Sequence, residues 1–383
     1  MNRSTDPWLI LTVALLVVFG MVMVYSASAV VALDGNGGEA RYLTRQLVAA
    51  VVGMGLCVGT AITPIRIIRR YRVALLVAVV LGLVLCYVPG IRNEAKGASR
   101  WIGFGGINVQ PSEFAKIVVL LMMAHFLDKR RGLVHDHRVV LRSLLIPLPI
   151  LLLILGQPDF GTTVIIAGLC GIMLIIAGMR LSHVGLAAGV GLAVTIPVIQ
   201  SQPYRLARIA SFMDPWGTAD KEGYHTIQSW VAMHSGGLTG QGLGASMAKL
   251  HFLPEPWTDY ISAVIAEELG LVALIGLITL YIILVWRGLA IAHRARDAFS
   301  MYLAATLSIM VGIEAFLNLA VVMGIVPPKG LVLPFISYGA SAMMSHLWIV
   351  GILLSIAAES QDEPVTAGWP TAPAAATPAQ GAA

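Results

Sequence analysis

Long apolar runs separated by short polar segments dominate the pattern of this chain. A run of about 17–25 apolar residues is long enough to cross a bilayer as a helix. By this criterion the chain has about ten spans: 8–31, 43–62, 73–89, 111–127, 143–157, 160–179, 184–200, 262–286, 300–323 and 340–357. The fifth is short, and Pro147 and Pro149 are expected to bend it. The pattern predicts an all-α polytopic membrane protein, with residues 1–358 forming one transmembrane domain.

Basic residues in the short connections set the expected orientation, because cytoplasmic loops are enriched in Lys and Arg. A cytoplasmic N-terminus puts most of these residues inside: Arg3, Arg66, Arg69, Arg70, Arg72, Lys129, Arg130, Arg131, Arg138, Arg142, Arg180, Arg287, Arg294 and Arg296. Both termini are then cytoplasmic. The large loop 201–261, between the seventh and eighth spans, is then extracytoplasmic.

The large loop and the C-terminal segment differ in composition. Loop 201–261 contains many aromatic residues and glycines but little low complexity, so we expect ordered structure packed on the bundle. Segment 359–383 is rich in Ala and Pro and has no apolar periodicity. We therefore expect a disordered cytoplasmic tail.

Composition excludes several classes of protein. The chain is 57% hydrophobic and 12% charged, about half the charged fraction of a soluble domain. Its net charge is +5, but no basic cluster is interleaved with aromatic residues, so no nucleic-acid partner is expected. The external histidines His225, His234 and His251 match no metal-ligand spacing, so the sequence predicts no protein-built metal site.

The most polar stretch, residues 240–271, leads directly into the eighth span. Asp259 lies where this loop meets the apolar helix, a costly position for a carboxylate that suggests a functional role. The alternative is a polar connector with a helix cap. At about 100° per residue, Glu267 lies nearer the Asp259 face and is a candidate cavity acid, whereas Glu268 lies on the far side and is expected to be paired structurally. Lys249 adds a cation to the stretch.

Three further polar features lie near the ends of spans. Arg100 adjoins Trp101 in connection 89–110, as either a snorkelling anchor or a contact to an anionic lipid headgroup. Glu113 and Lys116 are three apart at the start of the fourth span, share a helix face and are expected to form a structural ion pair. Asp159 is expected to cap the sixth span or, alternatively, to face inward.

The last external connection, 327–341, has prolines and glycines on both sides of an apolar middle. Irregular backbone at membrane depth is tolerated only where it is buried in protein or lines a cavity. We therefore expect this loop to dip into the bundle from outside. That position would bring Lys329 to the same external vestibule as Lys249 and Asp259.

Several motifs together, in this order and spacing, resemble one family. They are RWIGFGGINVQPSEFAK at 100–116, QPDFGT at 157–162, FMDPW at 212–216, GYHTIQS at 223–229, the 240–271 stretch and PPKGLVLPFISYGAS at 327–341. They resemble the SEDS family, the polytopic cell-wall polymerases typified by FtsW and RodA, over nearly the whole chain up to the tail. The Lys at position 329 makes the chain more similar to the FtsW branch of the family, since RodA-like members usually lack this Lys. The chain departs from the family at Trp257, where a His is common, and at Pro328, where a Thr is usual.

The resemblance implies a peptidoglycan glycosyltransferase that polymerises lipid II at the outer face of the cytoplasmic (inner) membrane, in cell division at the septum. The family's essential Asp corresponds to Asp259, the expected catalytic base. The implied partners are a class B penicillin-binding protein, which is a transpeptidase, and other division proteins. The candidate substrate-binding residues are Arg100, Lys249, Lys329, Glu267 and Ser337.

The expected chemistry needs a base and cations. A sugar hydroxyl is a poor nucleophile until a base takes its proton, and cations stabilise the charge that grows on a leaving diphosphate. Arg100, Lys249 and Lys329 are the candidate cations, and a divalent ion such as Mg or Mn could accompany the diphosphate. The alternatives are a RodA-like elongation polymerase, a lipid II transporter (flippase) and a non-catalytic division scaffold. Clustering of the acids on one side favours surface chemistry over transport.

Overall fold

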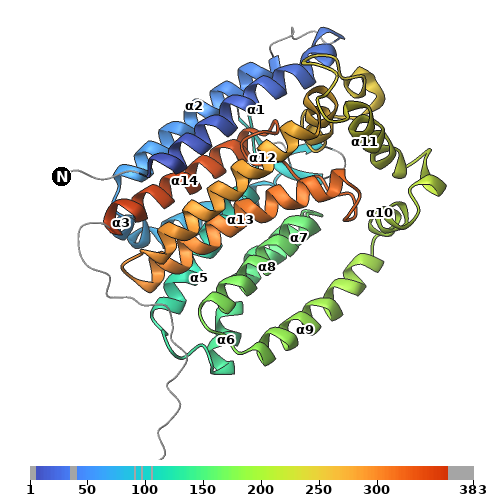
Figure 1. Ribbon diagram of the computed structural model, residues 1–383. Helices are drawn as coiled ribbons and strands as arrows, with labels where there is room; N and C mark the ends of the chain where they lie inside the picture. Colours follow the sequence, from blue (N-terminus) through green and yellow to red (C-terminus); the bar gives the residue numbers. More distant parts are fainter. Residues whose placement is uncertain (1–5, 35–40, 90–91, 96–97, 105–106, 361–383) are drawn as a thin grey trace, which may run out of the picture.

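The computed structural model of the chain describes residues 6–34, 41–89, 92–95, 98–104 and 107–360. Most of these residues are helical (Figure 1). The helices of the bundle are α1 (Pro7–Asp34), α2 (Arg41–Ile62), α3 (Ile65–Arg70), α4 (Arg72–Leu85), α5 (Pro111–Asp128), α6 (His137–Leu144), α7 (Leu148–Gly156), α8 (Phe160–Ile176), α9 (Leu181–Gln200), α12 (Ile261–His293), α13 (Ala298–Val322) and α14 (Ala340–Ser360).

Each predicted span except the fifth falls on one helix, but not every helix has the length of a span. Among the described residues, six helical segments are long and apolar enough to cross a membrane: Pro7–Ala29, Arg41–Ile62, His137–Gly156, Ile261–His293, Ala298–Val322 and Ala340–Ser360. Helices α4 and α8 are apolar but shorter. The predicted number of ten spans and the positions of both termini therefore stay predictions.

Two element boundaries differ from the sequence-based expectation. The fifth predicted span is divided into α6 and α7, with Pro147 as the N-cap of α7, because Pro cannot donate the backbone hydrogen bond that a continuous helix needs. Helix α14 runs through Ser360, two residues into the predicted tail. The rest of that tail, 361–383, lies outside the described residues.

The all-α expectation is wrong in one connection. Strands β1 (Arg92–Ala95), β2 (Ala98–Phe104) and β3 (Ile107–Val109) form an antiparallel sheet in the order β1-β2-β3. Arg92 pairs with Ile102, and Ile102 with Val109. This pairing satisfies the backbone groups of a segment too rich in glycine to form a helix.

The large loop after α9 is ordered, as its composition predicts. It contains α10 (Pro203–Met213), the short 3₁₀ helix η1 (Trp216–Thr218), α11 (Gly223–Gly236) and the π-helical turn η2 (Ala248–Phe252). Helix α11 packs against α12, and η2 contacts α1 and α11. These elements gather at the end of the bundle where α12 begins (Figure 1).

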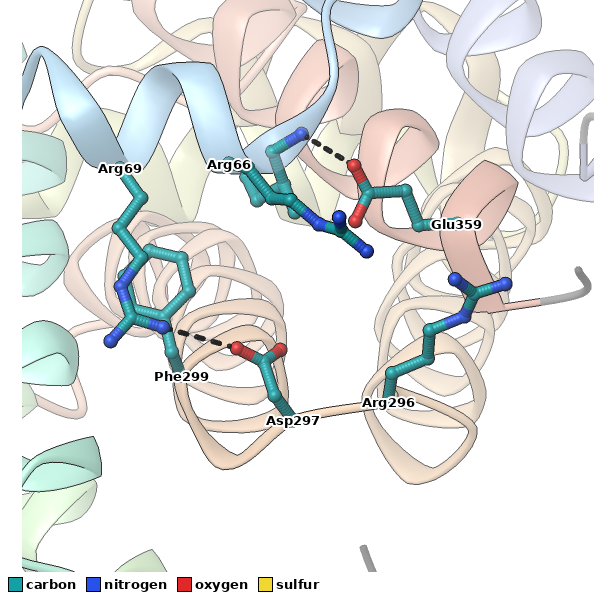
Figure 2. Close-up of a pocket in the computed structure, with 7 residues that line it drawn as sticks. Arg66, Arg69, Arg296, Asp297, Phe299 and Glu359 are labelled. Carbon is teal, nitrogen blue, oxygen red and sulfur yellow. Dashed lines mark hydrogen bonds and ion pairs between the residues drawn. The ribbon is translucent and has the colours of Figure 1, made fainter. Parts of the chain in front are cut away.

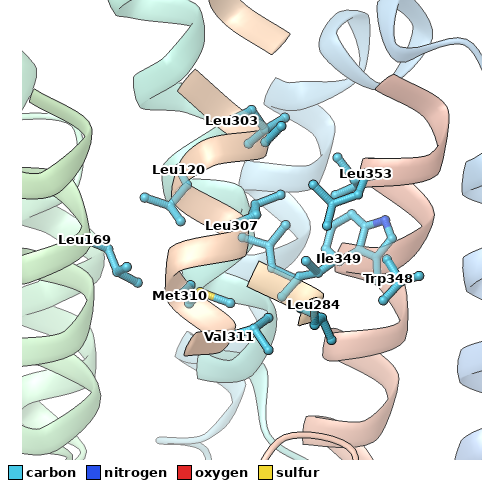
Figure 3. Close-up of a cluster of buried hydrophobic side chains, with 14 of the residues drawn as sticks. Leu120, Leu169, Leu284, Leu303, Leu307, Met310, Val311, Trp348, Ile349 and Leu353 are labelled. Atoms are coloured by element: carbon cyan, nitrogen blue, oxygen red, sulfur yellow. The ribbon is translucent and has the colours of Figure 1, made fainter. Parts of the chain in front are cut away.

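The core lies between α5, α12, α13 and α14. Leu120, Leu307, Ile349 and Leu353 are fully buried there, and Leu284 is nearly so (Figure 3). Helix α13 is buried along most of its length, whereas α1 and α2 expose apolar side chains such as Val18 and Val51. The exposed apolar helix faces are those expected of a bundle surrounded by lipid.

Glycines set the spacing between α2 and α14. A Cβ atom on Gly351 would lie 2.6 Å from the backbone oxygen of Cys57, and one on Gly53 would lie 2.7 Å from a methyl carbon of Leu347. Small residues at such contacts let membrane helices approach closely, so that dispersion contacts hold them together.

We expect Gly351→Ala to destabilise the bundle by about 1–3 kcal/mol, because the added methyl group meets backbone that cannot move aside. The measurement is thermal unfolding of the purified protein in detergent. Gly55→Ala is the matched control, since a Cβ at Gly55 meets no atom within 4 Å. Equal unfolding temperatures for the two variants would contradict this packing.

Candidate active site

Asp259 lies just before α12 in a segment whose backbone is held from several sides. Asn318 donates from Nδ2 to the Asp259 carbonyl oxygen at 2.9 Å and to that of Leu331 at 2.5 Å. Ser337 donates to the Thr258 carbonyl at 2.6 Å, and the Tyr338 N–H donates to the Trp257 carbonyl at 2.9 Å. The half-buried Asp259 is therefore fixed by α13 and by the connection between α13 and α14.

The connection between α13 and α14 dips into the bundle, as its composition predicts. Leu333, Phe335 and Ile336 are buried, and the Tyr281 hydroxyl of α12 donates to the Pro334 carbonyl at 2.5 Å. Gln46 of α2 donates to the carbonyl of Ser337 at 3.1 Å and accepts from the N–H of Gly339 at 3.1 Å. Side chains of α2, α12 and α13 thus supply hydrogen bonds to the backbone of a connection that is not helical.

This connection brings Gly330 and Lys329 to the site. A Cβ atom on Gly330 would lie 2.9 Å from Oδ2 of Asp259, so the carboxylate rests against the glycine backbone. The Lys329 side chain crosses the start of α8, where a Cβ atom on Gly161 would overlap Lys329 Cε. A side chain larger than hydrogen at either glycine would displace one of the two charged groups.

Asp159 at the start of α8 has both of the roles that the sequence left open. Its carboxylate caps α8 by accepting from the Thr162 N–H at 3.2 Å and from the Thr162 hydroxyl at 2.9 Å. It is also buried close to Lys329. Burial lowers the pKa of the Lys329 amine to about 8, although the nearby Asp159 carboxylate opposes the shift.

Arg100 of β2 reaches the turn that precedes α8. It donates from Nη2 to the Pro158 carbonyl at 2.5 Å and from Nε to the Gln157 carbonyl at 3.4 Å, and its Nη1 lies 3.9 Å from Asp159 Oδ1. The sheet therefore places the Arg100 guanidinium beside the start of α8, where the Lys329 side chain also lies. Together Arg100, Lys329, Asp159 and Asp259 make two cations and two carboxylates at one end of the bundle.

A buried ionic network lies in the helices beside this corner. Lys116 Nζ lies 2.9 Å from Glu113 Oε2, as expected for an ion pair between these two residues. It also lies 2.6 Å from Glu314 Oε1. His346 of α14 contacts Glu314 Oε2 at 2.7 Å. The sequence did not predict that Glu314 and His346 would extend the pair, because the four residues come from three helices whose facing sides depend on their packing.

The acids Glu267 and Glu268 anchor the large external loop to α12. Glu267 accepts from the Ser246 hydroxyl at 2.5 Å and from the backbone N–H groups of Met247 and Ala248 at 3.1 and 3.2 Å. Glu268 lies 2.9 Å from Lys249 Nζ, the structural pairing expected from its helical position.

Three candidate substrate-binding residues are thus committed to internal contacts. Lys249 is buried against Glu268 and the Gly244 carbonyl, Glu267 is buried under loop 246–248, and the Ser337 hydroxyl bonds to Thr258 and Leu333. Substrate contact by these residues stays a prediction, and it would require each to give up its present partners. Spacing along the chain could not reveal those partners.

Two arginines of α10 also belong to this end of the bundle, although the sequence did not single them out. The Arg205 guanidinium lies 5.3 Å from the centre of the Phe160 ring, which begins α8. Arg208 acts on Tyr260, the residue after Asp259. Burial raises the pKa of Tyr260 to about 12, the Asp259 charge adds to the rise, and the Arg208 charge opposes it. The only signal for these arginines in the sequence was the spacing of three residues between Arg205 and Arg208, which puts them on one face of a helix.

A metal site built by the protein finds no support in the described part of the chain. No group of three or more His, Cys, Asp or Glu side chains there could hold an ion. The site combines the half-buried Asp259 carboxylate with two cations at the same end of the bundle, Lys329 and Arg100, that can bind an anionic group.

Comparisons with known proteins show the family of this chain. The family model described as "Cell cycle protein" (FtsW, RodA and SpoVE) matches residues 7–362. A probable peptidoglycan glycosyltransferase FtsW of Trichlorobacter lovleyi is 42% identical over 94% of this chain and 95% of its own length. Stage V sporulation protein E of Bacillus subtilis is 36% identical over 94% of this chain and 99% of its own.

Solved structures share the fold. A chain described under "Structural coordination of polymerization and crosslinking by a peptidoglycan synthase complex" superposes with a TM-score of 0.78 and is 26% identical, covering 94% of this chain and 99% of that one. A mutant of the rod shape determining protein RodA of Thermus thermophilus superposes with a TM-score of 0.69 at 25% identity and the same coverage. This chain therefore belongs to the FtsW, RodA and SpoVE family of cell cycle proteins.

Proposed function

We propose that the chain is a peptidoglycan glycosyltransferase that polymerises lipid II into glycan strands at the outer face of the cytoplasmic membrane, with an FtsW-like role at the division septum. Its relatives carry this activity in their names. One observation supports the mechanism most strongly: the Asp259 carboxylate rests on Gly330, next in the chain to the half-buried cation Lys329.

In the proposed reaction, the hydroxyl of an acceptor sugar attacks the anomeric carbon of the donor sugar. The bond between that carbon and the lipid diphosphate breaks, and the hydroxyl proton passes to the Asp259 carboxylate. General-base catalysis of this kind contributes about 10²–10⁴-fold to a rate. The fixed backbone on both sides of Asp259 keeps its carboxylate oriented without an entropy loss during the reaction.

The leaving diphosphate gains negative charge as the bond breaks. Lys329 and Arg100 can stabilise that charge, and Asp159 positions both cations, since it lies near each of them. A partly desolvated ammonium interacts strongly with an anion, because little water screens it. A divalent ion, if used, would arrive with the diphosphate rather than in a protein-built site.

The proposal includes a partner. One structural relative comes from a peptidoglycan synthase complex that couples polymerization with crosslinking. We therefore expect this chain to act beside a class B penicillin-binding protein that crosslinks the new strands, together with other division proteins.

Asp259→Asn should lower the rate of strand synthesis by about 10²–10⁴-fold, because the amide cannot take the hydroxyl proton. The measurement uses purified protein, labelled lipid II, a divalent ion and the partner transpeptidase, with products separated by length. Asp220→Asn, an exposed acid of the same external region, should retain activity. Strands from both variants would remove Asp259 from catalysis, and none from folded wild type would favour transport or scaffolding.

The kcat/KM of strand synthesis should fall as the pH rises through about 8, because Lys329 then loses the proton that makes it a cation. In Lys329→Arg the guanidinium stays charged above pH 12. This variant should therefore lose the alkaline decline, even if its longer side chain lowers the overall rate. An unchanged decline in Lys329→Arg would assign it to another group.

Gly161→Ala should slow strand synthesis by about 10–100-fold without changing any charge, because the new methyl group displaces Lys329 from the start of α8. Gly168→Ala in the same helix is the matched control, since a Cβ there meets no atom within 4 Å. Comparable rates for both variants would show that the position of Lys329 does not matter.

A further inference from the structure

A pocket lies at the end of the bundle opposite Asp259. Helix α12 begins beside Asp259 and ends, 33 residues later, at the turn that forms one wall of this pocket. The helix kinks at Gly270, and the part after the kink (271–293) rises about 35 Å at 1.5 Å per residue, so the pocket lies far from Asp259. The pocket has a volume of about 150 Å³, and its walls come from α3, the α12–α13 turn and the end of α14 (Figure 2).

Charged side chains dominate the lining of the pocket. Arg66 and Arg69 extend from α3, Arg296 and Asp297 come from the α12–α13 turn, and Glu359 comes from α14. The lining therefore carries three positive charges and two negative ones. It belongs to neither the Asp259 corner nor the buried network around Lys116.

Both acids of the pocket already serve the fold. Asp297 lies 3.2 Å from Arg69 Nη1 and caps α13 by accepting from the Ser300 N–H at 3.2 Å. Glu359 accepts from the backbone N–H of Ile65 at 3.0 Å, which holds the start of α3. Arg69 is also committed, since its Nη2 lies 2.5 Å from Asp128 Oδ2 and its guanidinium stacks on Phe299.

Arg66 has no such commitment. Among the residues that the structure describes, no hydrogen bond or ion pair to its guanidinium is present, and its side chain is exposed. Figure 2 shows this guanidinium directed into the pocket, between Glu359 and Arg296. A guanidinium presents paired donors that match two oxygens of a phosphate, so its position suits an oxyanion.

Exposed apolar side chains in and beside α3, the helix that carries Arg66, indicate the source of the oxyanion. Ile62, Ile67 and Tyr71, which lie in or next to α3, are exposed to 64%, 44% and 58%. A helix that exposes apolar side chains and also lines a basic pocket suits a ligand with a charged head and an acyl chain. Basic pockets between membrane helices on the cytoplasmic side bind the headgroups of anionic lipids.

We infer that this pocket binds the phosphate of an anionic phospholipid, with Arg66 as its main ligand and Arg296 completing the positive wall. The acyl chains would lie along the apolar surface of α3. Such a lipid would join α3, the α12–α13 turn and the end of α14 from outside the protein. The site would operate independently of the chemistry at Asp259.

The test measures lipid retention by native mass spectrometry on the full-length chain in detergent with equal amounts of phosphatidylglycerol and phosphatidylcholine. Wild type should retain phosphatidylglycerol preferentially. Arg66→Gln should weaken that binding about fivefold, as expected for the loss of one arginine near a phosphate. Arg70→Gln, an exposed arginine of the same helix outside the pocket, should change it less than twofold.

Three outcomes would overturn the inference. They are an absence of preference for phosphatidylglycerol, an equal loss in both variants, and a loss in Arg66→Gln that accompanies a lower unfolding temperature in phosphatidylcholine alone. A separate measurement adds inorganic phosphate to the protein in phosphatidylcholine. An Arg66-dependent thermal shift there, without lipid preference, would identify a soluble phosphate as the ligand and reject the lipid.

Discussion

Hydrocarbon offers no hydrogen-bond partners, so every polar group within the bundle must find one in the protein. The rest of the structure depends on this constraint. The connection between α13 and α14 meets this demand without helix or strand. Asn318, Gln46, Ser337 and Tyr281 supply the hydrogen bonds that its backbone lacks. Asn318 and Ser337 also donate to the carbonyl groups of Asp259 and Thr258, so two of the side chains that satisfy this connection also fix the backbone at Asp259.

The charged residues divide into two groups by what they contact. Lys249 with Glu268, and Lys116 with Glu113 and Glu314, form buried pairs at hydrogen-bonding distances. Breaking such a pair strands an uncompensated charge, which is strongly destabilising. Asp259, Lys329 and Arg100 lie at the end of the bundle against loops and helix starts. This second group is the one that our mechanism uses.

The two ends of the bundle present different chemistry. At the Asp259 end, Gly330 leaves room for the Asp259 carboxylate and Gly161 leaves room for the Lys329 side chain. At the other end, arginines of α3 and of the α12–α13 turn surround a small pocket, and its acids are occupied by the fold. Helix α12 runs from one end to the other, so the proposed site of group transfer and the proposed lipid site lie far apart.

Periodicity along the chain predicted where most of the helices lie, and the order of the motifs identified the family and singled out Asp259 and Lys329 as candidates. Both signals can be read from residues near one another in the sequence. Only the tertiary structure decided that Lys249 pairs with Glu268, that Glu314 and His346 join Lys116, and that a sheet delivers Arg100 to Asp159. Those contacts join residues distant in the chain. Whether a buried charge is paired depends on which helix faces meet, and a single sequence does not encode that in any local pattern.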